Sequence, residues 1–380
     1  MYNICGACVK QQYRNGTVAK NILSLLVQTL KEEGVNSLGV DCETLNPTAL
    51  RFWGKYFDLY TYSYERRVDE RVIGYEEWFL NQIEKKKEKC NMYQFISNVH
   101  ENEQIKKSFN ELTQKVFCFS FEDWDNRGLW TSNFKPYVIV DGERVISNVS
   151  VNFMTFFVDG EKKHYIQLGT VMTDPDYRNQ GLGRRILEHI LKEYKDKVDG
   201  IFLFGNDSVI DYYPRFGFSV GTEYEYYQEI DSSKALMLAE KVDMSKIENI
   251  NQVLDAFQSR TVNERLAMID NRGIAGFYAT QLMSENYYYL KEENAFVVAE
   301  IEEDTLRLHL VIADHVVDLN RVIYSFGNTI REVVLHFTPL NCNQFSERIH
   351  KEEDCTYFYL GEDLKRITKG KLMFPTISHT

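Results

Sequence analysis

The residues with the clearest chemical potential form a glycine-containing turn in the middle of the chain. The run Gln180-Gly181-Leu182-Gly183 follows Arg178 and opens a segment with the periodicity of an amphipathic helix. The first N–H groups of a helix have no partner inside it, and glycines allow a ligand to approach them closely. Such a turn is suited to binding a pyrophosphate. On its own, the tetrapeptide is equally compatible with a surface turn flanked by arginines.

Cysteines are the other residues to consider for metal or redox chemistry. Cys5 and Cys8 are spaced as Cys-x-x-Cys, but no second Cys or His pair has the spacing of a zinc site. The 7 cysteines are odd in number and scattered, which is typical of free thiols in a reducing compartment. We therefore expect no metal and no disulfide framework, and we interpret Cys5 and Cys8 as small residues of a strand.

The segments around the glycine turn predict parallel strands joined by a helix. Residues 168–173 have an extended pattern that Asp174-Pro175-Asp176 ends. A helix over 184–194 then leads to a buried strand over 201–204. Upstream, the sequence predicts a helix and two strands, with Asp-Gly turns after the strands, over 101–117, 137–140 and 145–157.

The same unit occurs again at the N-terminal end of the chain. Residues 14–23 align without a gap with 178–187, and residues 46–57 align with 206–217. The first copy begins inside the strand that precedes its turn. It therefore represents only the back half of the unit.

Beyond residue 235 the same order of helices and strands recurs without the glycine motif. The predicted elements are a helix from 247, strands over 295–301 and 306–312, a helix over 316–326, and strands over 333–337 and 357–360. We divide the chain into a half domain at 1–75, a linking helix at 76–89, a central domain at 90–232 and a C-terminal domain at 235–380.

The composition limits the class of protein. Of the 380 residues, 44% are hydrophobic and only 6 are proline, so we expect the chain to fold throughout. The net charge of −12 disfavours nucleic acid as a partner. No apolar run reaches the ~18 residues that span a bilayer, and the start lacks the features of a signal peptide. These features predict a cytoplasmic protein with no membrane partner.

A second motif gives the central domain a specific resemblance. Residues 206–218 match the pattern Asn-x-x-Ala-x-x-x-Tyr-x-x-x-Gly-Phe, with Val209 as the only departure. Residues 171–183 match the Arg/Gln-x-x-Gly-x-Gly/Ala pattern of an acyl-CoA site. Together the motifs resemble the GNAT superfamily, the Gcn5-related N-acetyltransferases. The resemblance implies an α/β (α+β) GNAT acyl-CoA N-acyltransferase fold, with a mixed central sheet and helices on both faces, repeated here in tandem.

More narrowly, residues 90–380 resemble an uncharacterised branch of GNAT proteins, in which one GNAT domain is followed by a smaller GNAT-like domain. The residues that carry this likeness are 121–124, 165–173 and 372–379. Residues 1–75 then resemble the back half of a further GNAT domain. That half domain has Thr17 in place of the motif glycine and Trp53 in place of the motif tyrosine, so we expect it to bind no CoA.

The resemblance implies roles for the motif residues. The motif strand splays from its neighbour in GNAT enzymes, so the backbone of Val171 and Thr173 is implied to bind the pantetheine arm of acetyl-CoA. Tyr213 is implied as the general acid for the departing thiolate, which needs a short hydrogen bond because a phenol has a pKa of about 10. Asn206 is implied to bind pantetheine or a water. The implied cofactor-binding residues are Val171, Met172, Thr173, Arg178, Asn179, Gln180, Gly181, Leu182, Gly183, Arg184, Arg185 and Asn206.

Two of these assignments have structural alternatives. Tyr213 is also consistent with an aromatic residue packed beside Tyr212 and Phe216. Asn206 is also consistent with a cap for the residues that follow it.

The general base has several candidates. Glu122, Asp123 and Asp125 lie where this fold borders the acceptor, although acidic residues in such places are usually only solvated. His164 stands beside a turn, and many GNAT enzymes use a chain of waters instead. The Eis acetyltransferases, a tandem-GNAT family, use the terminal carboxylate as a base. By that resemblance Thr380 is a candidate, because the residues just before it are apolar enough to be buried.

These expectations describe an enzyme that transfers acetyl to the primary amine of a small acceptor. Nearly all of the net charge of −12 lies in residues 81–380, which favours a cationic acceptor. The alternatives are a non-catalytic module that senses acyl-CoA and an aminoacyl-transferase of the tandem-GNAT type. The complete motif with Tyr213 favours the enzyme, and the negative charge disfavours a tRNA substrate. The half domain would expose an unpaired strand edge, so we also expect a possible homodimer.

Overall fold

The computed structural model describes residues 2–4, 25–26, 28–32, 38–40, 93–236 and 238–379. It consists of two compact units, residues 1–80 and 81–380, which are described separately. In the first unit, β1 (Tyr2–Ile4) pairs in parallel with β2 (Leu38–Val40), and residues 28–32 between them are helical. Cys5, Cys8, the linking helix predicted at 76–89 and most of the predicted half domain lie outside the described residues, so those predictions stay predictions.

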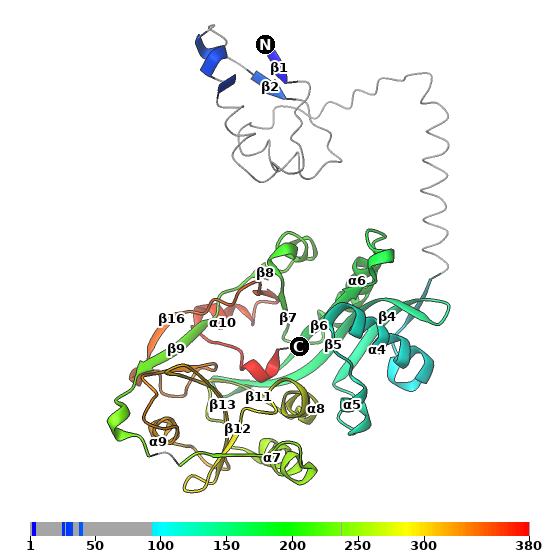
Figure 1. Ribbon diagram of the computed structural model, residues 1–380. Helices are drawn as coiled ribbons and strands as arrows, with labels where there is room; N and C mark the ends of the chain where they lie inside the picture. The colour runs from blue at the N-terminus through cyan, green and yellow to red at the C-terminus, as the bar shows by residue number, and fades with distance from the viewer. Residues whose placement is uncertain are drawn as a thin grey trace, which may run out of the picture. The chain divides into compact units, whose positions relative to one another are not determined.

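The second unit contains two mixed sheets (Figure 1). The first has the strand order β3-β4-β5-β6-β7-β17-β8, and β11 pairs with β5. Its strands are β3 (Gln94–Ile96), β4 (Phe134–Asp141), β5 (Arg144–Val158), β6 (Glu161–Thr173), β7 (Gly200–Gly205), β8 (Ser219–Val220), β11 (Leu266–Ile269) and β17 (Thr356–Leu360). The long hairpins follow the predicted Asp-Gly turns, because Gly142 and Gly160 both adopt the positive φ that such turns need.

Helices cover both faces of the first sheet, as the resemblance implies. On β7, Phe202 packs in one core cluster with Phe109 of α4 (Glu103–Phe117) and Trp124 of α5 (Glu122–Asn126). The neighbouring Leu203 packs in another cluster with Ile186 of α6 (Leu182–Tyr194). Because successive side chains of a strand point to opposite faces, a strand covered on both sides is apolar throughout. This explains the uninterrupted run at 201–204.

The second sheet is also mixed. Its order is β10-β12-β13-β14-β15-β9-β16, and each sheet has one parallel pair, β6 with β7 and β14 with β15. The strands are β9 (Tyr224–Glu229), β10 (Glu240–Lys241), β12 (Tyr287–Leu290), β13 (Ala295–Glu302), β14 (Thr305–Ile312), β15 (Glu332–Leu335) and β16 (Ser346–Ile349). The helices are α7 (Ile247–Ser259), α8 (Arg272–Phe277), α9 (Leu319–Tyr324) and α10 (Lys365–Lys369). A helix joins the two strands of each parallel pair, α6 in the first sheet and α9 in the second.

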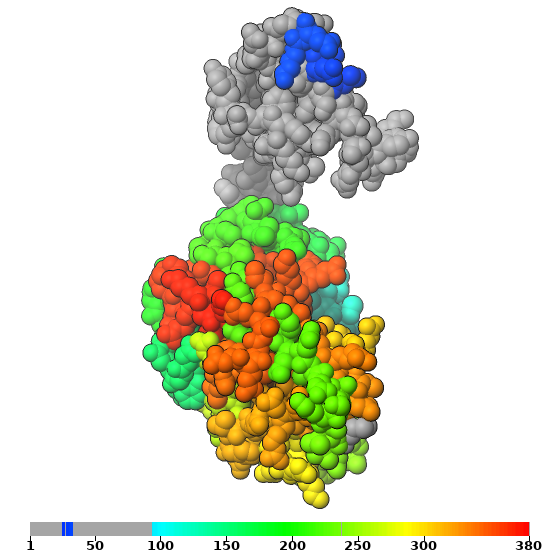
Figure 2. All heavy atoms as spheres, turned by 90° about the vertical axis from the view of Figure 1, so that its left-hand side faces the viewer, coloured from blue at the N-terminus to red at the C-terminus, as the bar shows by residue number. Residues whose placement is uncertain are grey.

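Three strands lie in a different sheet from their neighbours along the chain: β9 joins the second sheet, and β11 and β17 join the first. β9 follows β8 along the chain but lies in the second sheet, between β15 and β16. β17 follows β16 but lies in the first sheet, between β7 and β8. Figure 2 shows the green residues of the first half lying among the orange residues of the second. The sheets therefore differ from the predicted division at 232–235, because an apolar pattern predicts a strand without predicting which sheet it joins.

Short helical turns connect these elements. They are η3 (Val99–Glu101), η4 (Pro175–Tyr177), η5 (Asp207–Val209), η6 (Tyr213–Phe216), η7 (Ser232–Lys234), η8 (Tyr278–Leu282), η9 (Cys342–Gln344) and η10 (Thr376–Ser378). The C-terminal segment is buried, as its apolar residues predict, and the ring of Phe374 stacks on Phe202 with the ring centres 4.2 Å apart. Among the described residues, no helix has the length and apolar character needed to cross a bilayer.

Candidate active site

The central feature of the first sheet is a divergence between two parallel strands. β6 pairs with β7 only where Tyr165, Ile166 and Gln167 face residues 200–202. Beyond these pairs β6 continues to Thr173 and β7 to Gly205 without pairing with each other. Backbone N–H and C=O groups need hydrogen-bond partners, so the facing edges of the two strand ends are suited to bind an extended, amide-containing chain.

A bulge on β6 accompanies this divergence. The register between β5 and β6 shifts between Asn148 and Ser150, and Thr170 adopts a φ of 44°. The Asn148 Nδ2 group donates to the backbone oxygen of Thr170 (2.7 Å) and to Ser150 Oγ (3.0 Å). A bulge bends its strand, so these bonds fix the direction in which the end of β6 points. That end carries the motif residues predicted to bind pantetheine: Val171 is partly exposed, Met172 is buried, and Thr173 Oγ1 lies 2.8 Å from Ser147 Oγ.

The glycine turn lies between β6 and the start of α6. Asn179 and Gly181 both have positive φ angles, 62° and 78°, and Gly181 precedes the helix without any side-chain cap. No atom lies within 4 Å of the position that a Cβ on Gly181 would take. The first N–H groups of α6 therefore face open space, which is the arrangement expected for an anion site. Arg178, Arg184 and Arg185 are exposed around it.

A buried carboxylate anchors the approach to this turn. Asp174 accepts from Lys115 (2.9 Å), Arg144 (2.7 Å) and the backbone N–H of Asp176 (3.1 Å). Burial by itself raises the pKa of Asp174, but these donors outweigh it and hold the pKa below its usual value. The residue that directly follows the motif strand is therefore a carboxylate fixed by two cationic side chains and one backbone N–H.

Tyr213 is buried in an aromatic cluster. Its ring contacts Tyr212, Phe218 and Phe358, with centre distances of 5.1 to 5.8 Å. Within residues 93–236 and 238–379, its hydroxyl makes no hydrogen bond. Burial raises its pKa far above the usual value, so the phenol stays protonated and is able to donate. Packing and proton donation, the two alternatives for this residue, are thus compatible.

Two further motif positions are placed by the structure. The Tyr212 hydroxyl lies 3.7 Å from the position of a Cβ on Gly183, which sequence reasoning missed because Tyr212 was considered only as a packing neighbour. Asn206 follows β7 and donates to Asp354 (2.8 Å). The same carboxylate accepts from the backbone N–H of Asp207 (2.8 Å), so Asp354, and not Asn206, caps the residues that follow.

The acidic candidates for the base are exposed or paired. Glu122 and Asp123 lie on the exposed side of α5, and Asp123 pairs with Arg127 at 2.8 Å. Asp125 pairs with Lys106 (2.7 Å) and His100 (3.0 Å). His164 is exposed, with Nδ1 at 3.4 Å from Thr155 Oγ1.

A cavity of about 120 Å³ adjoins the bulge of β6. Thr170 is one of its lining residues, and α5 and α8 each contribute one aromatic residue to the lining, Trp124 and Phe277. Its lining residues are Phe117, Phe119, Phe121, Trp124, Thr131, Asn133, Phe134, Asn152, Thr170, Asn271, Gly273, Ile274 and Phe277. None of the acidic candidates is among them.

Comparison with known proteins identifies the superfamily. A family model described as an acetyltransferase (GNAT) domain matches residues 99–221, which contain the diverging strands, the glycine turn and Tyr213. Through this domain the chain belongs to the GNAT superfamily. GNAT domains use acetyl-CoA, and the match supports N-acetyltransferase activity in general.

The relatives of this GNAT protein are distant. N-alpha-acetyltransferase 50 of Danio rerio is 29% identical over 145 residues, which are 35% of this chain and 80% of that protein. A conserved protein from Enterococcus faecalis V583, described as a probable N-acyltransferase, is 15% identical with a TM-score of 0.49, covering 72% of this chain and 73% of its own. The GNAT family N-acetyltransferase YhbS from Escherichia coli, in complex with CoA, is 20% identical with a TM-score of 0.28, covering 34% of this chain and 69% of its own.

The chain end lies at the divergence in the GNAT domain. The ring of His379 stacks on Phe204, a residue of β7 beyond its pairing with β6, with the centres 3.8 Å apart. The Tyr278 hydroxyl donates to the backbone oxygen of His379 (2.8 Å), and Tyr278 directly follows Phe277 of the cavity. Thr380, the predicted terminal base, lies outside the described residues.

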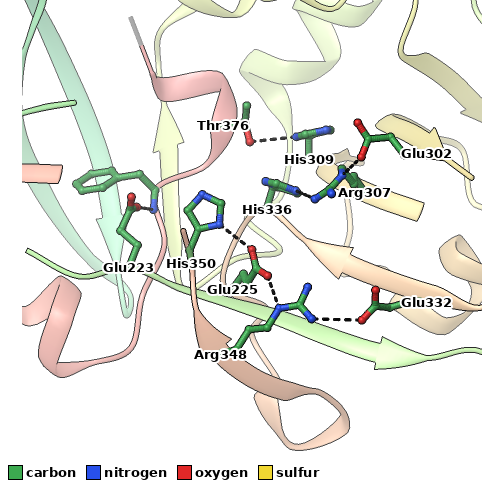
Figure 3. Close-up of polar contacts among 11 residues, drawn as sticks. Glu223, Glu225, Glu302, Arg307, His309, Glu332, His336, Arg348, His350 and Thr376 are labelled. Atoms are coloured by element: carbon green, nitrogen blue, oxygen red, sulfur yellow. Dashed lines mark hydrogen bonds and ion pairs between the residues drawn. The ribbon is translucent and has the colours of Figure 1, made fainter. Parts of the chain in front are cut away.

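A polar network holds this C-terminal segment in place (Figure 3). The Glu223 carboxylate accepts from the backbone N–H of Phe374 (2.7 Å), and His309 Nδ1 lies 3.0 Å from Thr376 Oγ1. Beside them, Glu225 accepts from His350 (2.6 Å) and Arg348. The C-terminal segment is therefore held by Glu223, which directly precedes β9, and by His309 of β14.

Proposed function

We propose that this GNAT domain transfers an acetyl group from acetyl-CoA to the primary amine of a small cationic acceptor. The observation that carries the proposal is the divergence of β6 and β7 next to the uncapped start of α6. An extended amide chain with a pyrophosphate at one end matches these two features in order. The backbone of Val171 and Thr173 would hold the pantetheine arm, and the turn at Gly181 its phosphates.

The chemistry of transfer assigns a proton donor and a proton acceptor. The amine nitrogen attacks the thioester carbonyl, the C–N bond forms, and the C–S bond breaks. Tyr213, kept protonated by burial, donates its proton to the leaving sulfur. The nitrogen must also lose a proton. A chain of waters is our candidate for that acceptor.

Charge supports a cationic acceptor. The chain carries a net charge of −12, and Glu122 and Asp123 are exposed on α5 next to Phe121 and Trp124 of the cavity. A negative surface raises the local concentration of a protonated amine. We therefore assign these carboxylates to attraction of the acceptor, and not to proton removal.

The direct test is Gly181→Val. Its side chain would occupy the open space in front of α6, so we expect the affinity for CoA in calorimetry to fall at least tenfold. Gly142→Val is the matched control, because Gly142 has a similar φ of 62° and equally open surroundings but lies in the β4–β5 turn. If Gly181→Val binds CoA as tightly as Gly142→Val does, the proposed cofactor site is wrong.

A further inference from the structure

The cavity beside the bulge of β6 has an unusual lining for a protein of net charge −12. Six of its lining residues are aromatic, and none carries a charge. The aromatic residues are Phe117, Phe119, Phe121, Trp124, Phe134 and Phe277. Phe117 is 42% exposed, whereas Phe121 and Trp124 are nearly fully buried. The cavity therefore leads from solvent at Phe117 to an aromatic floor.

The polar groups of the lining are already engaged. Asn271 accepts from the backbone N–H of Ile274 (3.2 Å) and donates to Phe153 O (3.4 Å). Asn133 donates to Asp270 O (3.4 Å), and Thr170 Oγ1 donates to Ser150 Oγ (3.0 Å). An occupant consequently meets aromatic faces and finds few polar atoms in need of a partner.

Size and desolvation restrict the occupant further. An apolar cavity of roughly 150 Å³ holds a benzene molecule in an engineered protein, so about 120 Å³ fits a single six-membered ring. A polyamine would place a second ammonium group in the cavity, where no carboxylate of the lining would balance it. Burial of an unpaired charge is strongly unfavourable. The aromatic faces at the rim attract one ammonium group, however, through cation–π interaction.

We propose that this cavity is the acceptor subsite and selects a primary amine joined by a short linker to one ring-sized apolar group. This inference rests on the proposed function, because Thr170 places the cavity at the strand that would hold the thioester. The free amine would remain near Thr170 while its ring lies against Phe121 and Trp124. Two sources have this chemistry: a free arylalkylamine and an aromatic residue at the N-terminus of a peptide.

The test measures binding before activity. Calorimetry on the full chain should detect phenethylamine and phenylalanine amide at millimolar concentration or below, and spermidine at least tenfold more weakly. Asn133 is a half-buried residue of the cavity wall, so the larger side chain of Asn133→Phe should fill the cavity. We expect this variant to bind phenethylamine at least tenfold more weakly. Ser132→Phe is the matched control, because Ser132 is exposed and does not line the cavity. Phe277→Leu is a second variant, which should improve binding of a naphthylethylamine relative to phenethylamine.

The outcomes separate this inference from the proposed function. The affinity for acetyl-CoA should be the same in the wild type, Asn133→Phe and Ser132→Phe. The loss of acetyl-CoA binding in Gly181→Val, in contrast, tests the cofactor site alone. Spermidine binding more tightly than phenethylamine, or phenethylamine binding unchanged in Asn133→Phe, would overturn the aromatic acceptor. If Asn133→Phe instead blocks only longer acyl-CoA donors, the cavity holds the acyl chain and the inference is wrong. Comparing phenethylamine with a phenylalanyl peptide as acceptor decides between the two sources.

Discussion

The buried carboxyl group of Glu223 should make the stability of the folded chain depend on pH in a defined direction. Burial raises the pKa of Glu223 to about 7, and the Phe374 N–H and the His350 charge only partly oppose this. A raised pKa means that the folded state binds more protons than the unfolded state between pH 4.5 and 7. The contribution of Glu223 to the free energy of unfolding is therefore greatest at low pH, and it is lost as the pH rises towards 7.

The expected size follows from the shift. A pKa change from the usual 4.5 to about 7 at ~1.4 kcal/mol per unit corresponds to about 3 kcal/mol of lost stability above pH 7. Glu223→Gln keeps an oxygen for the Phe374 N–H and removes the ionisation. The free energy of unfolding of Glu223→Gln minus that of the wild type should therefore rise by about 3 kcal/mol when the pH is raised from 4.5 to 8.

Urea denaturation of the two proteins at pH 5.0, 6.5 and 8.0 measures this difference directly. Glu225→Gln is the control two residues away. Burial raises the pKa of Glu225, but the hydrogen bonds from His350 and Arg348 outweigh it and lower the pKa to about 2, so this group is ionised in both states above pH 5. Glu225→Gln should therefore be less stable than the wild type at each pH, and most so at pH 5.0, because, against the effect of burial, Glu225 also raises the pKa of His350. A difference between Glu223→Gln and wild type that is the same at all three pH values would refute the reasoning.

Two further predictions concern the reaction. Tyr213→Phe should lower kcat by about 10²-fold or more, the usual contribution of a general acid, while calorimetry finds the CoA affinity unchanged; an unaltered kcat would leave Tyr213 as packing only. For cationic acceptors, kcat/KM should fall as salt is raised from low ionic strength to about 0.15 M, because screening weakens the attraction to the negative chain. Rates that do not respond to salt would remove the charge argument.

The local elements of the central domain are the part of the structure that the sequence predicts well. Ile105, Phe109 and Leu112 have helical spacing, and α4 ends at Phe117 as predicted. The turn at Gly181 precedes α6 as predicted because its positive φ suits glycine better than other residues. Such features depend on neighbours in the chain, and their signal is local.

The features that depend on contacts between residues far apart in the chain could not be predicted from the local sequence pattern. α8 has six residues, two of them glycine, so it shows no helical periodicity. Gly273 is required there because a Cβ would lie 2.8 Å from the backbone oxygen of Leu129, a contact that only the fold creates. The wall of the cavity that contains Phe277 was unpredictable for the same reason. The motif residues assigned to the cofactor stay predictions until CoA binding is measured.

The placement of β9 and β17 has a consequence for the order in which the fold is completed. Because the chain emerges from the ribosome N-terminus first, β3 to β16 emerge before β17 and before the segment that contains Phe374 and His379. Until then one edge of β7 has no partner, and the faces of Phe202 and Phe204 that Phe374 and His379 cover are open. The cover of these strands is therefore among the last parts of the unit to form, and a chain that lacks β17 would expose the free edge of β7.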